Sequence, residues 1–392
     1  MKILYVVNST RTAGGASKSF LTLLFGAQDK GIEPYVITPD KGDMYQALSN
    51  KGIPVTALNY RMNVYPDCHT IKDFFLFVPR LAGRRILEYK AVRNIIHLCK
   101  ENQIDIIHTN VSLVACGRKA AKKLGIPHVW HVREYGDLDF RYHHFPSKSA
   151  FYSELCTNDS YTICITKGIQ NHHHLKGQNS RVIYNGIEIT PSIGRSEFQK
   201  EIFFLYAGRM EPSKNPFQVV TAYHHFINTT PNNQAKLILA GPISDRTYWK
   251  KIKKYIYDFH LEKRVEYVGI RKDIDMLMRD ALATIVSSEF EAFGRCLPEA
   301  MINDCLTIGR NKGGTKEQYD NGVEFSGEEI GLRYETTEEL ANIMTEVYKA
   351  PKEQFIIMKA KAKEVVKNLY NKENYIKNVL SYYTDITNNY RK

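Results

Sequence analysis

The sequence predicts an α/β protein built from two doubly wound parallel sheets that follow one another along the chain. Short apolar runs alternate with helical patterns over the whole sequence, which is typical of parallel strands covered by helices. A length of 392 residues exceeds one α/β core of ordinary size and suits two. The alternation pauses after Asn185-Gly186, where Pro191, Ser192 and Gly194 form a turn-rich stretch that we expect to link two domains.

The predicted strands fall into two similar series, each opening with an apolar strand that runs into a loop. They lie at residues 2–7, 35–38, 55–58, 104–108, 128–132, 162–166 and 182–184, and then at 203–206, 236–240, 265–268, 284–287 and 306–308. Helical spacing follows most of these strands, and the sequence is helical from Thr337 to about Tyr383. We therefore expect one domain over residues 1–188, a second over 189–370 and a final helix over 371–392.

The formal net charge of +12 favours anionic partners such as nucleic acid, anionic lipid or phosphorylated small molecules. No nucleic-acid-binding signature appears. Between Arg80 and Lys100, six Lys or Arg residues stand against one acid, Glu88, and the aromatic residues Phe74, Phe75 and Phe77 lie just upstream. Two interpretations remain open for this stretch. It is either a helix that lies on an anionic bilayer surface, or a core-facing helix with a solvated basic face.

The sequence carries no pattern typical of an export signal or a membrane-spanning helix. Its longest strongly apolar run, Phe74 to Val78, is far shorter than the ~20 residues that a spanning helix needs. Seven scattered cysteines indicate reduced thiols, so we expect a cytoplasmic protein, peripheral on the inner membrane face if the basic helix binds lipid. We expect His172-His173-His174 on a polar surface, and no metal site, because no other ligand-spaced cluster accompanies the triplet.

Two loops after predicted strands carry residues suited to phosphates, since open parallel sheets bind ligands at the carboxyl ends of their strands. Gly14 and Gly15 allow backbone N–H groups to approach a phosphate at a helix N-terminus, although a plain tight turn explains the pair equally well. Arg209 and Lys214 follow a strand end, where a guanidinium fork and an ammonium group can hold a pyrophosphate. Neither the dinucleotide fingerprint G-x-G-x-x-G nor a P-loop occurs.

A third loop is bracketed by two glutamates, Glu291 and Glu299. Pro298 suits the first turn of the helix that follows, and Gly294 permits a close approach of the backbone to a ligand. Glu299 in the first helical turn also favours the helix dipole, whereas Glu291 in the loop has no such structural reason. Carboxylates beside a phosphate site are suited to accept hydrogen bonds from sugar and ribose hydroxyl groups.

Five segments together resemble the retaining glycosyltransferases of family 4. Glu291–Glu299 matches the E-x7-E motif, and Gly208–Lys214 matches the G-R-(x)4-K segment. Val182–Ile187 is similar to the V-I-x-N-G-I/V element, Asp105–Asn110 to the D-I/V-I/V-H strand end and Gly313–Glu317 to the late G-G-x-x-E loop. The resemblance covers nearly the whole chain. It implies the GT-B architecture, in which two Rossmann-like domains face each other across a cleft and the last helix crosses back to the first domain.

The resemblance also implies a role for each matched residue of the second domain. Arg209 and Lys214 would bind the donor diphosphate and stabilise its charge as the glycosidic bond breaks, so that no metal and no cofactor besides the nucleotide sugar is required. Glu291 would bind the donor sugar and Glu299 the ribose hydroxyl groups. The implied donor-binding residues are Gly15, Arg209, Lys214, Glu291, Phe293, Gly294 and Glu299.

In the first domain, the resemblance implies that His131 touches the sugar near the reaction centre, and a buried structural histidine is the alternative. Arg133 and Glu134 follow it without an assigned role. The implied catalytic residues are His131, Arg209, Lys214 and Glu291. The sequence departs from the family pattern at Arg295, Cys296, Pro298 and Asn215, which bears on sugar preference or loop shape.

We therefore predict a retaining hexosyltransferase that moves a sugar from a UDP- or GDP-sugar, with UDP favoured, to a saccharide acceptor. If the basic helix faces a membrane, the acceptor is lipid-linked, as in bacterial-type cell-surface polysaccharide or lipopolysaccharide assembly. Two alternatives remain: a nucleotide-sugar epimerase of the same fold, and a basic nucleic-acid- or membrane-binding protein with a degenerate site. The four charged residues are intact, which argues against a degenerate site and against nucleic acid as the partner.

Overall fold

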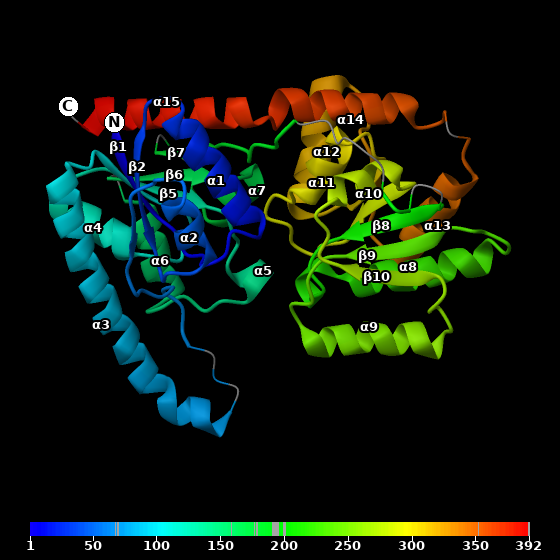
Figure 1. Ribbon diagram of the computed structural model, residues 1–392, viewed down its shortest axis with the longest axis horizontal. Coiled ribbons are helices and arrows are strands. Elements are labelled where there is room, and N and C mark those ends of the chain that lie inside the picture. The colour runs from blue at the N-terminus through cyan, green and yellow to red at the C-terminus, as the bar shows by residue number, and fades with distance from the viewer. Residues whose placement is uncertain are drawn as a thin grey trace. The chain divides into compact units, whose positions relative to one another are not determined.

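The computed structural model describes every residue of the chain except 67, 69, 158, 176, 178, 190–195, 199, 200, 352, 391 and 392. The chain forms two compact units: unit 1 comprises Met1–Gly186 with Lys372–Lys392, and unit 2 comprises Ile187–Asn371. Each unit contains one parallel sheet with helices packed on it (Figure 1). The predicted α/β class with two doubly wound sheets is confirmed. Of the predicted linker, Pro191, Ser192 and Gly194 lie outside the described residues.

The sheet of unit 1 has seven parallel strands in the order β3-β2-β1-β4-β5-β6-β7, so the direction of winding reverses between β1 and β4. The strands are β1 Lys2–Val6, β2 Glu33–Thr38, β3 Val55–Ala57, β4 Ile106–Thr109, β5 His128–Val132, β6 Ser160–Cys164 and β7 Ser180–Val182. Strands β4, β5 and β6 are buried along their whole length, because helices cover both faces of the sheet. Ligands of such sheets bind where the winding reverses, at the carboxyl ends of the strands.

Eight helices accompany this sheet in the described part of unit 1. They are α1 Gly15–Gln28, α2 Asp43–Ser49, α3 Ile71–Asn102, α4 Cys116–Leu124, α5 Asp137–Phe140, α6 Lys148–Leu155, α7 Lys167–His172 and α15 Lys372–Tyr390. Helix α15 packs against α1, and its Tyr375, Val379 and Tyr383 join the core formed by the strands of unit 1. The second half of α3 packs on α4, whereas Figure 1 shows its first half extending beyond the rest of unit 1.

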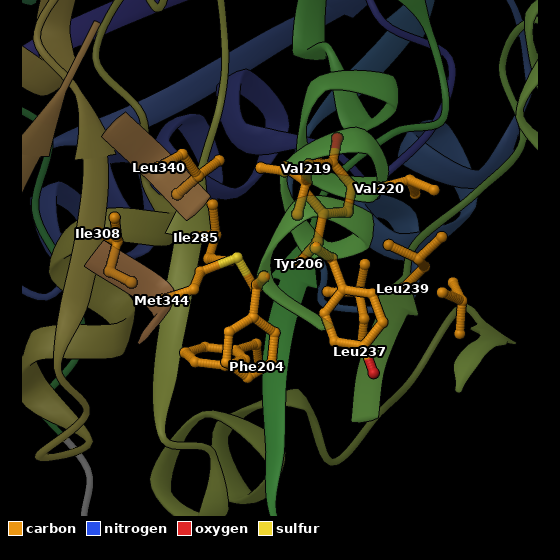
Figure 2. Packing of buried hydrophobic residues seen from close by; sticks show 14 of the residues in the cluster. Phe204, Tyr206, Val219, Val220, Leu237, Leu239, Ile285, Ile308, Leu340 and Met344 are labelled. Atoms are coloured by element: carbon orange, nitrogen blue, oxygen red, sulfur yellow. The ribbon is translucent and has the colours of Figure 1, made fainter. Parts of the chain in front are cut away.

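The sheet of unit 2 has six parallel strands in the order β10-β9-β8-β11-β12-β13. The strands are β8 Phe203–Ala207, β9 Lys236–Ala240, β10 Val265–Gly269, β11 Ala283–Val286, β12 Thr307–Arg310 and β13 Leu332–Tyr334. Its α-helices are α8 Pro216–Thr229, α9 Arg246–Asp258, α10 Ile274–Asp280, α11 Cys296–Ile302, α12 Gly313–Ser326, α13 Thr337–Lys349 and α14 Ile356–Leu369. Figure 2 shows Phe204 and Tyr206 of β8 in the core that this sheet forms with α8 and α13.

Two details near the end of the chain were not predicted. The helical stretch from Thr337 is three helices, because Pro351 cannot continue α13 and the carbonyl of Tyr370 instead accepts a hydrogen bond from the backbone of Ile187 at 2.6 Å. Strand β13 was not predicted, since three residues with a central Arg333 give no apolar run. Neither detail changes the strand ends that carry the predicted site residues.

Candidate active site

The contact between Lys214 and Glu291 is the centre of the site in unit 2. Arg209 follows β8 and Lys214 ends the 3-10 helix Pro212–Lys214, so both cations lie just beyond a strand end. The Nζ atom of Lys214 lies 2.8 Å and 2.7 Å from the two carboxylate oxygens of Glu291. Burial alone would raise the pKa of Glu291, but the Lys214 ammonium group holds that pKa below its usual value. Glu291 is therefore ionised at neutral pH.

The Arg209 guanidinium is more exposed than the Lys214 ammonium group. Its Nη2 atom lies 3.0 Å from Oε1 of Glu211, and 42% of the Arg209 side chain is exposed. Ion pairs that are this exposed contribute roughly 1 kcal/mol or less, because water screens them. Arg209 is therefore accessible to an incoming phosphate, and its pair with Glu211 opposes that contact only weakly.

Glycines shape the loop that carries Glu291. Gly294 has a φ of 81°, and a Cβ atom there would lie 2.6 Å from Cγ of Glu291. Gly313 and Gly314 begin α12 directly against the same loop, and the backbone N–H of Gly314 donates to the Glu291 carbonyl at 2.6 Å. A Cβ atom on Gly314 would lie 2.9 Å from that carbonyl. The G-G-x-x-E segment therefore packs against the backbone of the Glu291 loop and holds it in position.

Glu299 lies in the first turn of α11, where its Oε1 accepts a hydrogen bond from Nε of Arg295 at 3.0 Å. Arg295 is one of the residues that depart from the family pattern, and its ion pair orients the carboxylate that is predicted to bind ribose. The Phe293 side chain is 2% exposed and packs edge-on against Tyr370, so only its backbone is placed to serve a ligand. The sequence analysis identified Arg295 as a departure from the family pattern but did not predict its ion pair with Glu299.

Asn215, another departure from the family pattern, has a φ of 50°. This left-handed conformation favours glycine, and asparagine is the residue that tolerates it best after glycine. Ser287 fixes the same turn, because its hydroxyl group donates to the carbonyls of Lys214 and Asn215 at 2.8 Å and 3.1 Å. The substitution therefore preserves the backbone turn that presents Lys214.

The predicted site residues of unit 1 are Gly15 and His131. Gly15 is the exposed first residue of α1, and Gly14 before it takes the positive φ of 111° that the turn requires. His131 lies at the carboxyl-terminal part of β5 with no exposed surface. Its Nδ1 atom lies 3.3 Å from Nε2 of His108 and 3.2 Å from Nη2 of Arg133. Burial, and then the nearby charge of Arg133, lowers the pKa of His131 well below its usual value, so the ring is neutral.

The histidine triplet was expected on a polar surface, but the structure buries part of it. His173 is 1% exposed and its Nε2 atom lies 2.9 Å from the carbonyl of Glu134, while His172 pairs with Asp137 at 2.8 Å. Within the described residues, no group of three His, Cys, Asp or Glu side chains is arranged to hold a metal ion. In the same part of the chain, no helix is both long enough and apolar enough to cross a bilayer.

Two protein-family models match the chain in succession. Residues 13–190 match the model described as Glycosyltransferase Family 4, and residues 192–365 match that of Glycosyl transferases group 1. The chain belongs to the family 4-like glycosyltransferases. Among curated proteins, no sequence matches this transferase.

Solved structures similar to the transferase extend over almost its whole chain. HepE from Anabaena, in complex with UDP, has a TM-score of 0.76 at 21% identity and covers 98% of this chain and 100% of its own. A glycosyltransferase from Rickettsia africae has a TM-score of 0.77 at 18% identity, with 98% of both chains covered. The lipopolysaccharide outer core galactosyltransferase WaaB, in its apo form, has a TM-score of 0.66 at 20% identity, with 97% and 99% covered. These likenesses show the fold, and the transferase has the GT-B architecture.

Proposed function

We propose that the transferase moves a hexose from a UDP-sugar to a hydroxyl group of a saccharide, with retention of configuration and without a metal ion. The observation that carries this proposal is the Lys214 ammonium group held against the ionised Glu291, with Arg209 at the same strand end. Charge grows on the departing diphosphate as the glycosidic bond breaks, and the two cations stabilise it. The Glu291 carboxylate can meanwhile accept hydrogen bonds from the sugar hydroxyl groups.

The solved relatives support UDP as the donor base and a cell-surface saccharide as the acceptor. HepE was solved with UDP and with UDP-glucose, and WaaB is a lipopolysaccharide outer core galactosyltransferase. We propose that the transferase adds a sugar during the assembly of such a cell-surface saccharide. An epimerase of the same fold would convert the donor without any acceptor, and product analysis with and without a saccharide separates the two reactions.

Thermal unfolding with UDP, GDP, ADP or NAD tests the donor site. A ligand that binds only the folded chain stabilises it by roughly 2.7 kcal/mol at a hundredfold excess over Kd, and we expect this shift with UDP. Arg209→Ala should reduce the shift, because the variant loses a phosphate ligand. Arg181→Ala is the control, since Arg181 is also 42% exposed and also pairs with a carboxylate. No shift with UDP or GDP would contradict the proposal and favour a binding protein with a degenerate site.

We further propose that the acceptor is lipid-linked and that the first half of α3 lies on an anionic membrane surface. Six large apolar side chains of this helix are 56–81% exposed: Ile71, Phe74, Phe75, Val78, Ile86 and Tyr89. Their spacing follows one side of a helix, and the same helix enters the core further along the chain through Ala91, Val92 and Ile95. An outward apolar stripe of this length needs a partner with an apolar interior.

The charges beside the stripe indicate that the partner is anionic. Lys72, Lys90 and Arg93 are exposed on α3. The acid of the basic stretch, Glu88, turns inward and pairs with Lys119 at 2.6 Å and with Arg85 at 2.9 Å. Each basic residue near an anionic surface contributes about 1 kcal/mol to binding. The enzyme would then be cytoplasmic and peripheral on the inner face of the membrane.

Vesicle co-sedimentation tests this surface. We expect the enzyme to bind vesicles of phosphatidylglycerol and phosphatidylcholine, to bind phosphatidylcholine alone more weakly, and to dissociate in high salt. A Phe74→Ser/Phe75→Ser variant should lose most of the binding. An Ile356→Ser/Ile357→Ser variant, which changes two exposed apolar residues of α14, should keep it. Equal binding by both variants would contradict membrane docking through α3.

A further inference from the structure

Arg133 is a buried cation whose hydrogen-bond partners are uncharged. It follows β5 and is 6% exposed. Its Nε donates to Oδ1 of Asn110 at 2.9 Å and its Nη1 to Oδ1 of Asn185 at 2.7 Å. Its Nη2 donates to the hydroxyl oxygen of Tyr375 at 3.0 Å and lies 3.2 Å from Nδ1 of His131. A buried guanidinium is costly unless its donors are satisfied, so this arrangement holds Arg133 in one position.

The direction of the last contact follows from chemistry. A guanidinium only donates hydrogen bonds, so Nδ1 of His131 must be the acceptor. The pKa of His131 lies well below its usual value, and the neutral ring therefore carries its proton on Nε2. His108 fits the same pattern, because its Nε2 lies 3.3 Å from Nδ1 of His131 while its Nδ1 lies 2.7 Å from the Tyr383 hydroxyl group. When Tyr383 donates to Nδ1 of His108, the neutral His108 ring carries its proton on Nε2, and that N–H group faces Nδ1 of His131.

This assignment leaves the Nε2–H group of His131 as a donor without an acceptor. Nε2 is buried, and the described residues offer it no hydrogen-bond partner. A buried donor left unpaired costs about 1–3 kcal/mol, and such groups are rare in folded proteins. His131 lies near the carboxyl end of β5, the edge of a parallel sheet where ligands bind. An oxygen atom of a ligand would satisfy this donor.

We propose that Arg133 is a positioning residue that fixes His131 as the Nε2–H tautomer, so that the ring donates a hydrogen bond to a hydroxyl or ring oxygen of the transferred sugar. The saccharide part of this inference rests on the proposed function, whereas the tautomer does not. Helix α15 takes part through Tyr375, which accepts from Arg133, and through Tyr383, which contacts His108. The final helix thus holds the first-domain histidine as well as covering the core.

Nitrogen NMR of histidine-labelled protein tests the tautomer without any activity. In the wild type we expect a protonated Nε2 and an unprotonated Nδ1 on His131, with no titration between about pH 5 and 8. His131→Asn assigns the signal by its loss. Arg133→Met should produce a mixture of tautomers, and Arg133→Lys should restore part of the wild-type signal. A wild-type His131 protonated on Nδ1 would overturn the proposal, whatever the enzyme transfers.

Kinetics then connects the tautomer to the reaction. Arg133→Met should lower kcat by about 10²-fold, as small misplacements of a catalytic group do, with partial rescue in Arg133→Lys. The UDP-induced thermal shift should persist in both variants, since Arg209 and Lys214 are intact. Tyr375→Phe should act in the same direction as Arg133→Met. Tyr382→Phe, which removes a neighbouring buried hydroxyl group of α15, is the matched control and should leave kcat unchanged.

The outcomes separate this inference from the proposed function. Absence of a UDP-induced thermal shift in the wild type would contradict the donor proposal, whereas the NMR result would still test the tautomer of His131. A normal UDP shift with unchanged kcat in every folded Arg133 variant would overturn the positioning role alone. If Arg133→Met fails to fold, Tyr375→Phe and the wild-type spectrum still decide the question.

Discussion

Arg209→Ala is expected to lower kcat by about 10²–10³-fold, the usual effect of removing one group that stabilises transition-state charge. The Arg209 side chain is 42% exposed and water screens its ion pair with Glu211, so its removal should change the free energy of unfolding little. Release of UDP from the UDP-sugar, followed at saturating acceptor, measures the rate. Arg181→Ala, of equal exposure, should retain full activity. A normal kcat in Arg209→Ala would remove this residue from the mechanism.

Acid is expected to destabilise unit 1 before unit 2. Burial is the main cause that lowers the pKa values of His108, His128 and His131, to about 3 for His108 and well below the usual value for the other two. The folded chain keeps them neutral, while the unfolded chain protonates them below about pH 6.5. Their stabilising contribution is therefore complete above pH 6.5 and is lost as the pH falls. Three such groups reduce the free energy of unfolding by about 4 kcal/mol per pH unit well below that point.

Tryptophan fluorescence can follow each unit separately during urea unfolding. Trp130 lies in β5 with its ring 4.6 Å from that of His128, and Trp249 lies in α9 of unit 2. In a Trp249→Phe variant, the midpoint reported by Trp130 should fall steeply between pH 7 and pH 5. In a Trp130→Phe variant, the midpoint should fall less, because His224, His225 and His260 of unit 2 are all partly or fully exposed. Equal dependence on pH in both variants would contradict this assignment.

The strands of the fold were predictable because each buried strand is an apolar run of the right length. The start of α3 was not, since Pro79 and outward-facing aromatic residues argue against a helix. The structure accommodates Pro79 on an exposed stretch, where water can satisfy the carbonyl group that loses its partner. Helix α3 also begins earlier than expected, at a capping box formed by Thr70 and Asp73.

The charged residues of the site were found from their order along the chain, and the Lys214–Glu291 contact joins two of them directly. The support of His131 could not be found in that way. Its network depends on Arg133 reaching Asn185 and Tyr375, which are 52 and 242 residues away in sequence. No local spacing predicts partners at such separations. The roles of these residues stay predictions until the variants are measured.

The return of α15 to unit 1 determines the order in which the chain can reach its native state. Unit 2 occupies one continuous stretch, Ile187–Asn371, and every strand and helix assigned to it is synthesised before α15. Unit 1 lacks Tyr375, Val379 and Tyr383 of its core until then. Nascent unit 1 therefore carries an uncovered apolar face while unit 2 is synthesised, which makes that interval the period of greatest exposure to aggregation. This face can be covered only after α15 has been synthesised, and the same packing brings Tyr375 to Arg133.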